Sequence, residues 1–286
     1  MKFAFIRDHL QEYPVCSCCR YLKVSRSGYY ASLRRPVSRR QQRREELAAE
    51  ICRAHEDSRS VYGSPRLWRQ LRIQGQSICE NTVAKIMREE GLQAKKKRKF
   101  VPRTTDSSHD QPVAPNVLDR QFQASTPDRK WVADITYIPT DEGWLYLAGV
   151  MDLFSRRIVG WSMTDHLRAE LVSDALEMGL AGRRPSAGLL HHSDRGVQYA
   201  CDDYRGLLDR HELQVSMSGK GNCYDNAVME SFWSTLKTEL VHHEHYRTRD
   251  QARQSIFEYI EAFYNRKRLH SSLGYVSPET FEAAQE

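Results

Sequence analysis

The stretch WVADITYIPT, residues 131–140, places an aspartate in a segment that otherwise has the composition of a β-strand. Aromatic and β-branched residues dominate it, and such residues are typical of strands. Aspartate is depleted in strands and costs free energy when it is half-buried without a partner. Asp134 is therefore either a buried acid paired with an arginine or a residue held inside the fold to bind a cation.

The residues that follow predict a mixed α/β layout around this first strand. WLYLAGVMDLF and RRIVGWSMT are two more strand-like runs, and we expect a hairpin joined near Ser155. AELVSDALEMGL then has the pattern of an amphipathic helix, GLLHHSD that of a short strand running into a loop, and CDDYRGLLDRHEL that of another helix. The order strand, strand, strand, helix, strand, helix is typical of a mixed α/β domain.

Two further acids stand where structure alone does not require them. Asp194 ends the short strand of GLLHHSD, and Glu230 lies on a helix whose other faces are apolar. Singly, Asp194 has the alternative of a turn former and Glu230 that of an exposed helix residue. Asp225, at the start of the same helix, is expected to stabilise that start through the helix dipole.

Taken together, Asp134, Asp194 and Glu230 lie on elements that can converge on one point. Carboxylate oxygens are the ligands that Mg²⁺ and Mn²⁺ prefer, with the remaining positions left to water and phosphate. Two such ions about 4 Å apart activate a nucleophile and stabilise the leaving oxygen of a phosphodiester displacement.

The amino-terminal third differs from the rest in charge. Residues 1–103 hold 24 Lys/Arg against 10 Asp/Glu, whereas the whole chain has a net charge of only +6. Such a basic segment is typical of nucleic-acid binding, although a solvated basic helix surface is the alternative.

Two helix pairs are predicted in this basic segment. Pro14 opens the first pair, and Ser25 is the expected N-cap of its second helix. In the second pair Ser64 and Pro65 open one helix, Asn81 caps the next and Gly91 ends it. Two helices joined by a short turn place the second helix in a major groove of DNA, although any three-helix bundle shows the same pattern.

The chain divides into a helix-turn-helix region at residues 1–94, a basic and polar linker at residues 95–118, and an α/β domain with a helical tail at residues 119–286. The linker opens with Lys95, Lys96, Lys97, Arg98 and Lys99, which are expected to follow DNA phosphates. Its later part is polar and interrupted by prolines, as linkers are.

Cysteines and hydropathy indicate a cytoplasmic protein. Seven cysteines without framework spacing suit a reducing compartment. Cys16, Cys18 and Cys19 lack the two-residue gap of zinc ligands, which favours buried helix cysteines over a metal site with Cys52 and His55. We expect neither a signal peptide nor a membrane span, because the apolar runs are too short.

Five runs in unbroken order resemble DDE transposases of the insertion-sequence OrfB type, in the retroviral-integrase-like superfamily. The runs are WVADITYIPT, LAGVMDLFSRRIVGW, HHSDRGVQYA, SMSGKGNCYDNAVMESFWSTLKTE and YNRKRLHSSLGYVSPETFE. The 35 residues between Asp194 and Glu230 match the separation by which the acid triad of this superfamily is known. The helix-turn-helix region is also similar to this family, more loosely, and departs from it around Cys16 to Cys19.

This resemblance implies an RNase H-like catalytic core, a mixed sheet flanked by helices, behind an all-α helix-turn-helix region. Asp134, Asp194 and Glu230 would be the catalytic metal ligands for Mg²⁺ or Mn²⁺, with two ions expected when DNA is bound. Supporting residues would be His192, Asn226 and Lys237. DNA-binding residues would be Lys237, Arg266, Arg268 and His270, with an interface to a neighbouring subunit as the alternative for the last three.

The implied activity is metal-dependent phosphodiester hydrolysis followed by strand transfer at insertion-sequence ends. Its partners would be double-stranded DNA at the element ends and target, further copies of the chain on paired ends, and an upstream-frame protein. The expected location is the bacterial cytoplasm, on the nucleoid. Two alternatives are a DNA-binding regulator that uses only residues 1–103 and a metal-dependent nuclease of the same fold.

Overall fold

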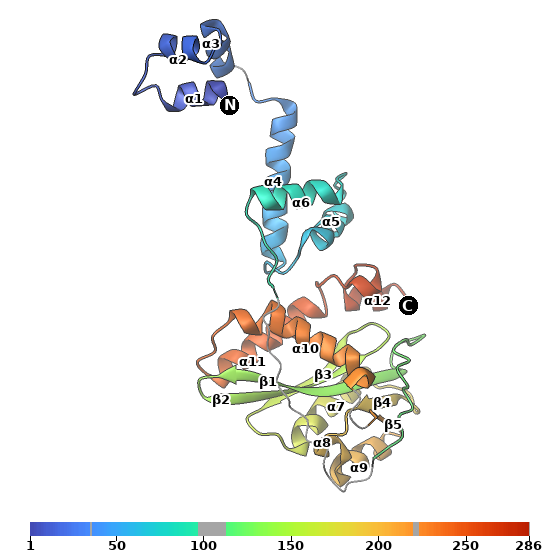
Figure 1. The fold of residues 1–286 in the computed structure, drawn as a ribbon. Coiled ribbons are helices and arrows are strands. Elements are labelled where there is room, and N and C mark those ends of the chain that lie inside the picture. Colours follow the sequence, from blue (N-terminus) through green and yellow to red (C-terminus); the bar gives the residue numbers. More distant parts are fainter. Residues whose placement is uncertain (35, 97–112, 220–222, 286) are drawn as a thin grey trace.

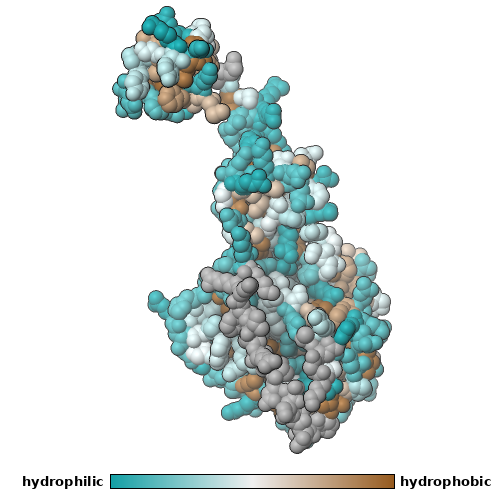
Figure 2. All heavy atoms as spheres, in the orientation of Figure 1, coloured by the Kyte–Doolittle hydropathy of each residue, from teal (hydrophilic) through white to brown (hydrophobic). Residues whose placement is uncertain are grey.

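The computed structural model describes residues 1–34, 36–96, 113–219 and 223–285, which form the three successive parts seen in Figure 1. We call them the amino-terminal unit (residues 1–34), the middle unit (residues 39–89) and the sheet unit (residues 113–219 and 223–285). Hydrophilic residues cover much of the visible surface of the middle unit (Figure 2). Within the described ranges, no helix is both long and apolar enough to cross a bilayer.

The amino-terminal unit consists of three short helices, α1 (Lys2–Asp8), α2 (Val15–Tyr21) and α3 (Arg26–Arg34). Ser25 caps α3 as predicted, because its Oγ accepts a hydrogen bond of 3.0 Å from the amide of Gly28. Cys18 and Cys19 are buried in a small core with Ile6 and Tyr29, which confirms the prediction of buried helix cysteines for these two. The prediction is wrong for Cys16, which is exposed, and Cys52 is only half-buried.

The middle unit contains α4 (Arg39–Asp57), α5 (Ser64–Ile73) and α6 (Glu80–Glu89). The predicted caps are shifted: Gly63 rather than Ser64 precedes α5, and Cys79 rather than Asn81 precedes α6. Because Glu80 and Asn81 are compatible with a first turn, α6 begins two residues earlier than the Asn81 cap implies. Gly91 has a φ of +69°, so it provides the expected left-handed stop.

The sheet unit is built on a five-stranded mixed sheet with the order β3-β2-β1-β4-β5. Its strands are β1 (Lys130–Thr140), β2 (Gly143–Asp152), β3 (Ile158–Thr164), β4 (Leu190–Ser193) and β5 (Gln214–Met217). The first three are antiparallel neighbours, whereas β4 and β5 run parallel to β1. The hairpin of β2 and β3 is confirmed, and β5 is a strand that the sequence pattern did not predict.

Helices cover both faces of this sheet. They are α7 (Ala169–Arg183), α8 (Val197–Ala200), α9 (Asp202–Arg210), α10 (Ala227–Glu239), α11 (Arg249–Phe257) and α12 (Pro278–Ala283). Short 3₁₀ turns lie at Cys223–Asn226, Val241–His243 and Ser271–Leu273, and a π-helical segment, Glu258–Tyr264, continues α11.

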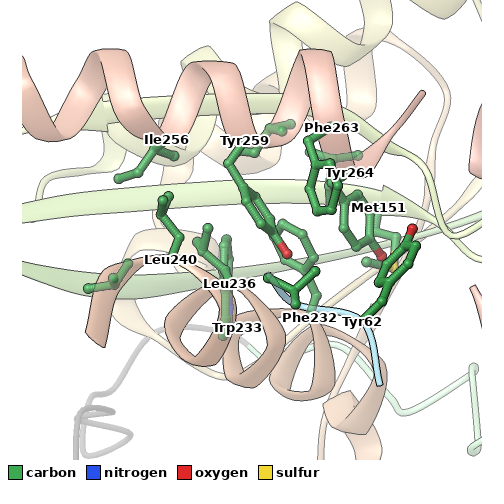
Figure 3. Packing of buried hydrophobic residues seen from close by; sticks show 14 of the residues in the cluster. Tyr62, Met151, Phe232, Trp233, Leu236, Leu240, Ile256, Tyr259, Phe263 and Tyr264 are labelled. Atoms are coloured by element: carbon green, nitrogen blue, oxygen red, sulfur yellow. The ribbon is translucent and has the colours of Figure 1, made fainter. Parts of the chain in front are cut away.

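Alternate residues of the central strands point to opposite faces, as in any strand. In β1, Trp131 and Ala133 join the core under α7 and α9, whereas Val132 joins the core under α10 and α11. Figure 3 shows part of this second core, where side chains from α10 meet Tyr259 and Phe263. Asp134 is two residues beyond Val132 and therefore lies on the α10 face of the sheet.

The middle unit shares that second core with the sheet unit. Tyr62 is buried and its hydroxyl accepts a hydrogen bond of 2.6 Å from the amide of Leu269. Lys95, from the predicted linker, donates a hydrogen bond of 2.9 Å to the carbonyl of Glu239 at the end of α10. The other end of that linker also packs on the sheet unit, because Leu118 is buried and its amide binds the Ser216 hydroxyl.

Candidate active site

The structure places Asp134 and Asp194 at neighbouring positions on adjacent strands. Strands β1 and β4 are parallel, and Val132 is paired with His192. Continuing this register by two residues brings Asp134 beside Asp194, just beyond the last residue of β4. Parallel strands present their carboxyl ends at the same edge of a sheet, which is where α/β proteins bind ligands.

A local turn holds Asp194 at the end of β4. The amide of Gly196 donates a hydrogen bond of 2.8 Å to Asp194 Oδ1. Aspartate commonly bonds the backbone two residues ahead in this way, which is why it starts turns. The predicted turn-forming property of Asp194 is thus real, and it leaves the half-buried carboxylate at the edge shared with Asp134.

Glu230 comes from α10, which crosses the same face of the sheet. The Asn226 side chain, just before α10, donates a hydrogen bond of 3.1 Å to the carbonyl of Ala133. This bond fixes the start of the helix against the residue that precedes Asp134. Glu230 lies one turn into α10 and is exposed, so its carboxylate is accessible from solvent at the same edge.

The charge of Asp134 interacts with those of the other two acids. Burial raises the pKa of Asp134 well above its usual range, and the nearby charges of Asp194 and Glu230 raise it further. Burial also raises the pKa of Glu230. Repulsion of the Asp134 carboxylate by two other carboxylates is unfavourable without a cation, and such perturbed groups gather at functional sites.

Lys237 lies on the same side of α10, two helical turns after Glu230. Burial lowers the pKa of the Lys237 ammonium, while the nearby carboxylate of Asp134 opposes that shift. The side chain is half-buried, and its charge interacts with that of Asp134. A cation in this place neutralises part of the carboxylate charge and can reach a phosphate bound there.

The donor set fits a hard divalent cation. All three side chains offer carboxylate oxygens, which Mg²⁺ and Mn²⁺ prefer over nitrogen or sulfur. Among the described residues no three acidic, histidine or cysteine side chains are gathered closely enough to hold an ion by themselves. Magnesium sites of phosphoryl-transfer proteins commonly use one or two carboxylates per ion and complete the shell with water and phosphate, so the spread of these acids is compatible with the cation.

His192, a predicted supporting residue, is buried and joins β4 to β5. Its Nδ1 lies 2.8 Å from the hydroxyl of Ser216 and its Nε2 lies 3.2 Å from that of Ser218. The Ser216 hydroxyl already accepts from two backbone amides, so it donates to Nδ1 and the imidazole proton sits on Nε2. Burial lowers the pKa of His192 to about 4, which makes it a neutral support of the strand that carries Asp194.

Asp225 lies at the approach to the helix, as predicted, and it has further contacts that the sequence did not predict. It lies in the 3₁₀ turn before α10, and its carboxylate accepts hydrogen bonds from Asn116, Arg120 and the amide of Gly219. Burial raises the pKa of Asp225, but these hydrogen bonds outweigh it and the pKa is lowered. Asp225 therefore also ties residues 116–120 to the approach of α10.

The predicted DNA-contact residues of the linker and the tail fall into three groups: residues outside the described part of the chain, exposed residues, and residues with partners inside the protein. Lys97, Arg98 and Lys99 lie outside the described residues. Lys96 and Arg266 are exposed, and Arg266 lies 3.7 Å from Glu279.

Arg268 requires a correction, because its side chain is 5% exposed and binds Glu239 through three hydrogen bonds. Lys95 bonds inside the protein as described above. His270 is half-buried next to Ser272, and burial followed by nearby arginines lowers its pKa to about 4, so its imidazole is neutral.

Trp233 contacts the site but was not among the predicted site residues. Its indole Nε1 donates a hydrogen bond of 3.0 Å to Asp134 Oδ2. Two features of the sequence point to this contact in retrospect. Trp233 is three residues after Glu230, hence on a neighbouring face of α10, and a buried indole N–H usually finds an acceptor.

A mixed sheet that presents two aspartates at one edge, with a glutamate on the crossing helix, defines an integrase-type polynucleotidyl transferase core. Comparison with known families agrees. The integrase core domain family matches residues 124–223, a second integrase core domain family matches residues 230–285, and an HTH-like domain family matches residues 42–100.

Relatives identify the family. The chain is 47% identical over 284 residues to transposase InsF for insertion sequence IS3A of Escherichia coli (strain K12), covering 99% of this chain and 98% of that protein. It is 48% identical over 263 residues to the insertion element IS600 uncharacterized 31 kDa protein of Shigella sonnei, covering 92% and 96%. The chain belongs to the family of the InsF transposases of insertion sequence IS3, and it is a transposase that acts in DNA recombination.

Solved structures of integrases are also similar to the chain. The HTLV-2 integrase catalytic core domain in complex with magnesium has a TM-score of 0.43 at 13% identity, covering 56% of this chain and 99% of that one. A chain in the structure of the simian T-cell lymphotropic virus intasome in complex with PP2A regulatory subunit B56 gamma has a TM-score of 0.48 at 14% identity, covering 81% of this chain and 74% of that one.

Proposed function

We propose that this transposase cuts and joins DNA at insertion-sequence ends by metal-dependent phosphodiester hydrolysis and strand transfer, and that Asp134, Asp194 and Glu230 hold the metal. The observation that carries the proposal is the position of these acids. They come from two adjacent strands and the crossing helix, and they lie close enough for Asp194 and Glu230 to raise the pKa of Asp134. A binding site for a divalent cation accounts for a charge arrangement that destabilises the protein by itself.

The residues have separate tasks in this proposal. When bound, a pair of Mg²⁺ or Mn²⁺ ions activates the attacking hydroxyl and neutralises charge on the leaving oxygen. Asp134 and Asp194 hold their oxygens at the sheet edge, and Glu230 supplies the third carboxylate from the solvent side. Lys237 binds a phosphate of the DNA next to the scissile bond. Water is the first attacking group and the freed 3′-hydroxyl is the second, so no covalent enzyme intermediate is required.

The helical units bring the DNA to this site. The HTH-like match over residues 42–100 supports DNA binding by the middle unit, and the basic charge of residues 1–103 supports contacts to phosphates. We infer that double-stranded element ends and target DNA are the partners. The proposal also includes a homo-oligomer on paired ends, an upstream-frame protein, and action on the nucleoid in the bacterial cytoplasm.

A strand-joining assay tests the proposal. The protein is incubated with a labelled DNA duplex that ends in the element's terminal repeat, with Mg²⁺, and the products are separated on a denaturing gel. We expect cleaved and joined products with the natural chain and none with Asp134→Asn. The control is Asp141→Asn, which removes an exposed acid on the β1–β2 turn and should leave both products unchanged.

The alternatives give different products in the same assay. Cleavage without joining would favour a nuclease of this fold. DNA binding without cleavage, unchanged by Glu230→Gln, would favour a DNA-binding regulator. Joining by the Asp134→Asn protein would overturn the proposed mechanism.

A further inference from the structure

The indole of Trp233 makes the contact to Asp134 described above, and it is almost completely enclosed. Its Nε1 lies 3.0 Å from Asp134 Oδ2, and the side chain is 5% exposed. An indole N–H can only donate, so the bond requires an accepting carboxylate oxygen. Figure 3 shows Trp233 on the core side of α10, next to Leu236.

The opposite strand is shaped to admit this indole. Gly149 of β2 is paired directly with Asp134 of β1, and residues paired in this way project to the same face of the sheet. A Cβ added at Gly149 would lie 2.8 Å from Trp233 Cη2 and 3.3 Å from the terminal carbon of Met229. The absence of a side chain at Gly149 therefore creates the slot in which the indole reaches Asp134.

We propose that Trp233 is a positioning residue that orients the Asp134 carboxylate for metal binding. Its hydrogen bond engages Oδ2, so the rotation of the carboxylate is restricted and the group keeps a fixed orientation toward a cation. Groups that hydrogen-bond a metal ligand from behind commonly set both its orientation and the affinity of the site. This inference rests on the proposed function, because it takes Asp134 as a ligand.

The hydrogen bond between Trp233 and Asp134 also links the helix that carries Glu230 to the strand that carries Asp134. Trp233 and Glu230 are three residues apart on α10, while Asp134 is on β1. A direct bond from α10 to the Asp134 carboxylate therefore sets the distance between helix and strand at the site itself. The Asn226 bond to Ala133 does the same at the start of the helix, so the two bonds together prevent α10 from shifting along the sheet.

The experiment measures metal binding directly. Binding of Mn²⁺ to the DNA-free protein is followed by electron paramagnetic resonance, which reports free Mn²⁺, for the natural chain and for Trp233→Phe. The phenyl ring keeps most of the packing but removes the donor. We expect Mn²⁺ affinity to fall by about 10- to 100-fold, the range typical of lost partners behind a metal ligand. Strand joining by Trp233→Phe should recover at high Mn²⁺ concentration, because the orientation of the Asp134 carboxylate affects the affinity for Mn²⁺ more than the rate of the chemical step.

Trp161→Phe is the matched control. The indole of Trp161, which pairs with Gly149 from the neighbouring strand β3, also donates to a carboxylate, at 2.8 Å from Glu261 Oε1, but this acceptor is not one of the three acids. Trp161→Phe removes a hydrogen bond of the same type and should leave Mn²⁺ affinity unchanged. Equal Mn²⁺ affinity of Trp233→Phe and the natural chain would overturn the inference, as would an equal loss in Trp161→Phe.

Gly149→Ala tests the same inference while keeping the indole. The added Cβ displaces the ring, and we expect weaker Mn²⁺ binding here too, with the change in melting temperature measured separately. Asp134→Asn distinguishes this inference from the proposed function. If Asp134→Asn leaves Mn²⁺ binding unchanged, the proposed function fails. If Asp134→Asn abolishes binding while Trp233→Phe and Gly149→Ala bind normally, only the positioning by Trp233 is wrong.

Discussion

Replacing Arg268 with alanine should destabilise the protein strongly. The Arg268 guanidinium makes hydrogen bonds of 3.1, 2.8 and 2.7 Å to Glu239, and the two side chains are 5% and 8% exposed. Without Arg268, the partners of the buried Glu239 carboxylate among the described residues would be the Tyr259 hydroxyl at 2.7 Å and the more distant Arg66 guanidinium at 3.8 Å. Removal of one partner of a buried ion pair costs about 3–5 kcal/mol, because the other charge stays buried.

The assay is unfolding by urea, followed by tryptophan fluorescence, together with a thermal melt. A loss of about 3–5 kcal/mol corresponds to a decrease of roughly 6–20 °C in melting temperature for a unit of this size. Glu239→Gln in the Arg268→Ala background removes the unpaired charge, so the double variant should recover part of the lost free energy of unfolding. That recovery separates an unpaired charge from a simple packing defect.

Arg266→Ala is the control for this prediction, because Arg266 belongs to the same basic run but is 63% exposed. Its removal should change the free energy of unfolding by less than about 0.5 kcal/mol. If Arg266 contacts a phosphate, the alanine variant should also reduce the salt dependence of DNA binding by about one unit of slope. The reasoning is refuted if Arg268→Ala unfolds like the natural chain and weakens DNA binding in this salt-dependent way.

Three further predictions follow from the described contacts. Because the folded pKa of Asp134 lies above the unfolded value of 3.8, the metal-free protein should lose stability as pH rises from about 4 through the folded pKa. Asp134→Asn should remove that loss and stabilise the metal-free protein at pH 8 by on the order of 1 kcal/mol. A melting temperature of the variant that is unchanged or lower at pH 8 would contradict this prediction. Gly160→Ala should cost about 3 kcal/mol or prevent folding, because the new Cβ would lie 2.0 Å from the carbonyl oxygen of Ala175 in α7, and urea unfolding at the natural midpoint would argue against this close approach. Tyr62→Phe should cost about 1–3 kcal/mol by leaving the Leu269 amide without its acceptor, measured as a lower urea midpoint, and no change would show that water replaces the hydroxyl.

The strands of the sheet unit were predictable where β-branched and aromatic residues follow one another over a long run. The first three strands are long and rich in β-branched and aromatic residues, so their existence and the hairpin near Ser155 were predictable. The fifth strand has only four residues, Gln214–Met217, and follows a helix closely, so it carries no periodic signal. Asp134 was recognisable because an acid inside such a strand is unusual.

Long-range partners explain what the sequence did not reveal. Arg268 lies in the basic run NRKRLH, which resembles an exposed DNA-contact segment, and its partner Glu239 is 29 residues earlier, at the end of α10. Nothing local distinguishes Arg268 from Arg266, although one is buried and the other exposed. The Trp233 contact is equally hidden, because a tryptophan on the apolar side of a helix usually indicates packing alone.

The rate of strand joining by Glu230→Gln, with Mg²⁺ and a duplex that carries the terminal repeat, tests the central claim most directly. Glu230 is exposed, so its neutral isostere leaves the fold and the urea midpoint intact. The account predicts that DNA binding persists while cleavage and joining both fall to the level seen without protein. Joining at the natural rate by this folded variant would contradict the claim that Asp134, Asp194 and Glu230 act together as the metal-binding site.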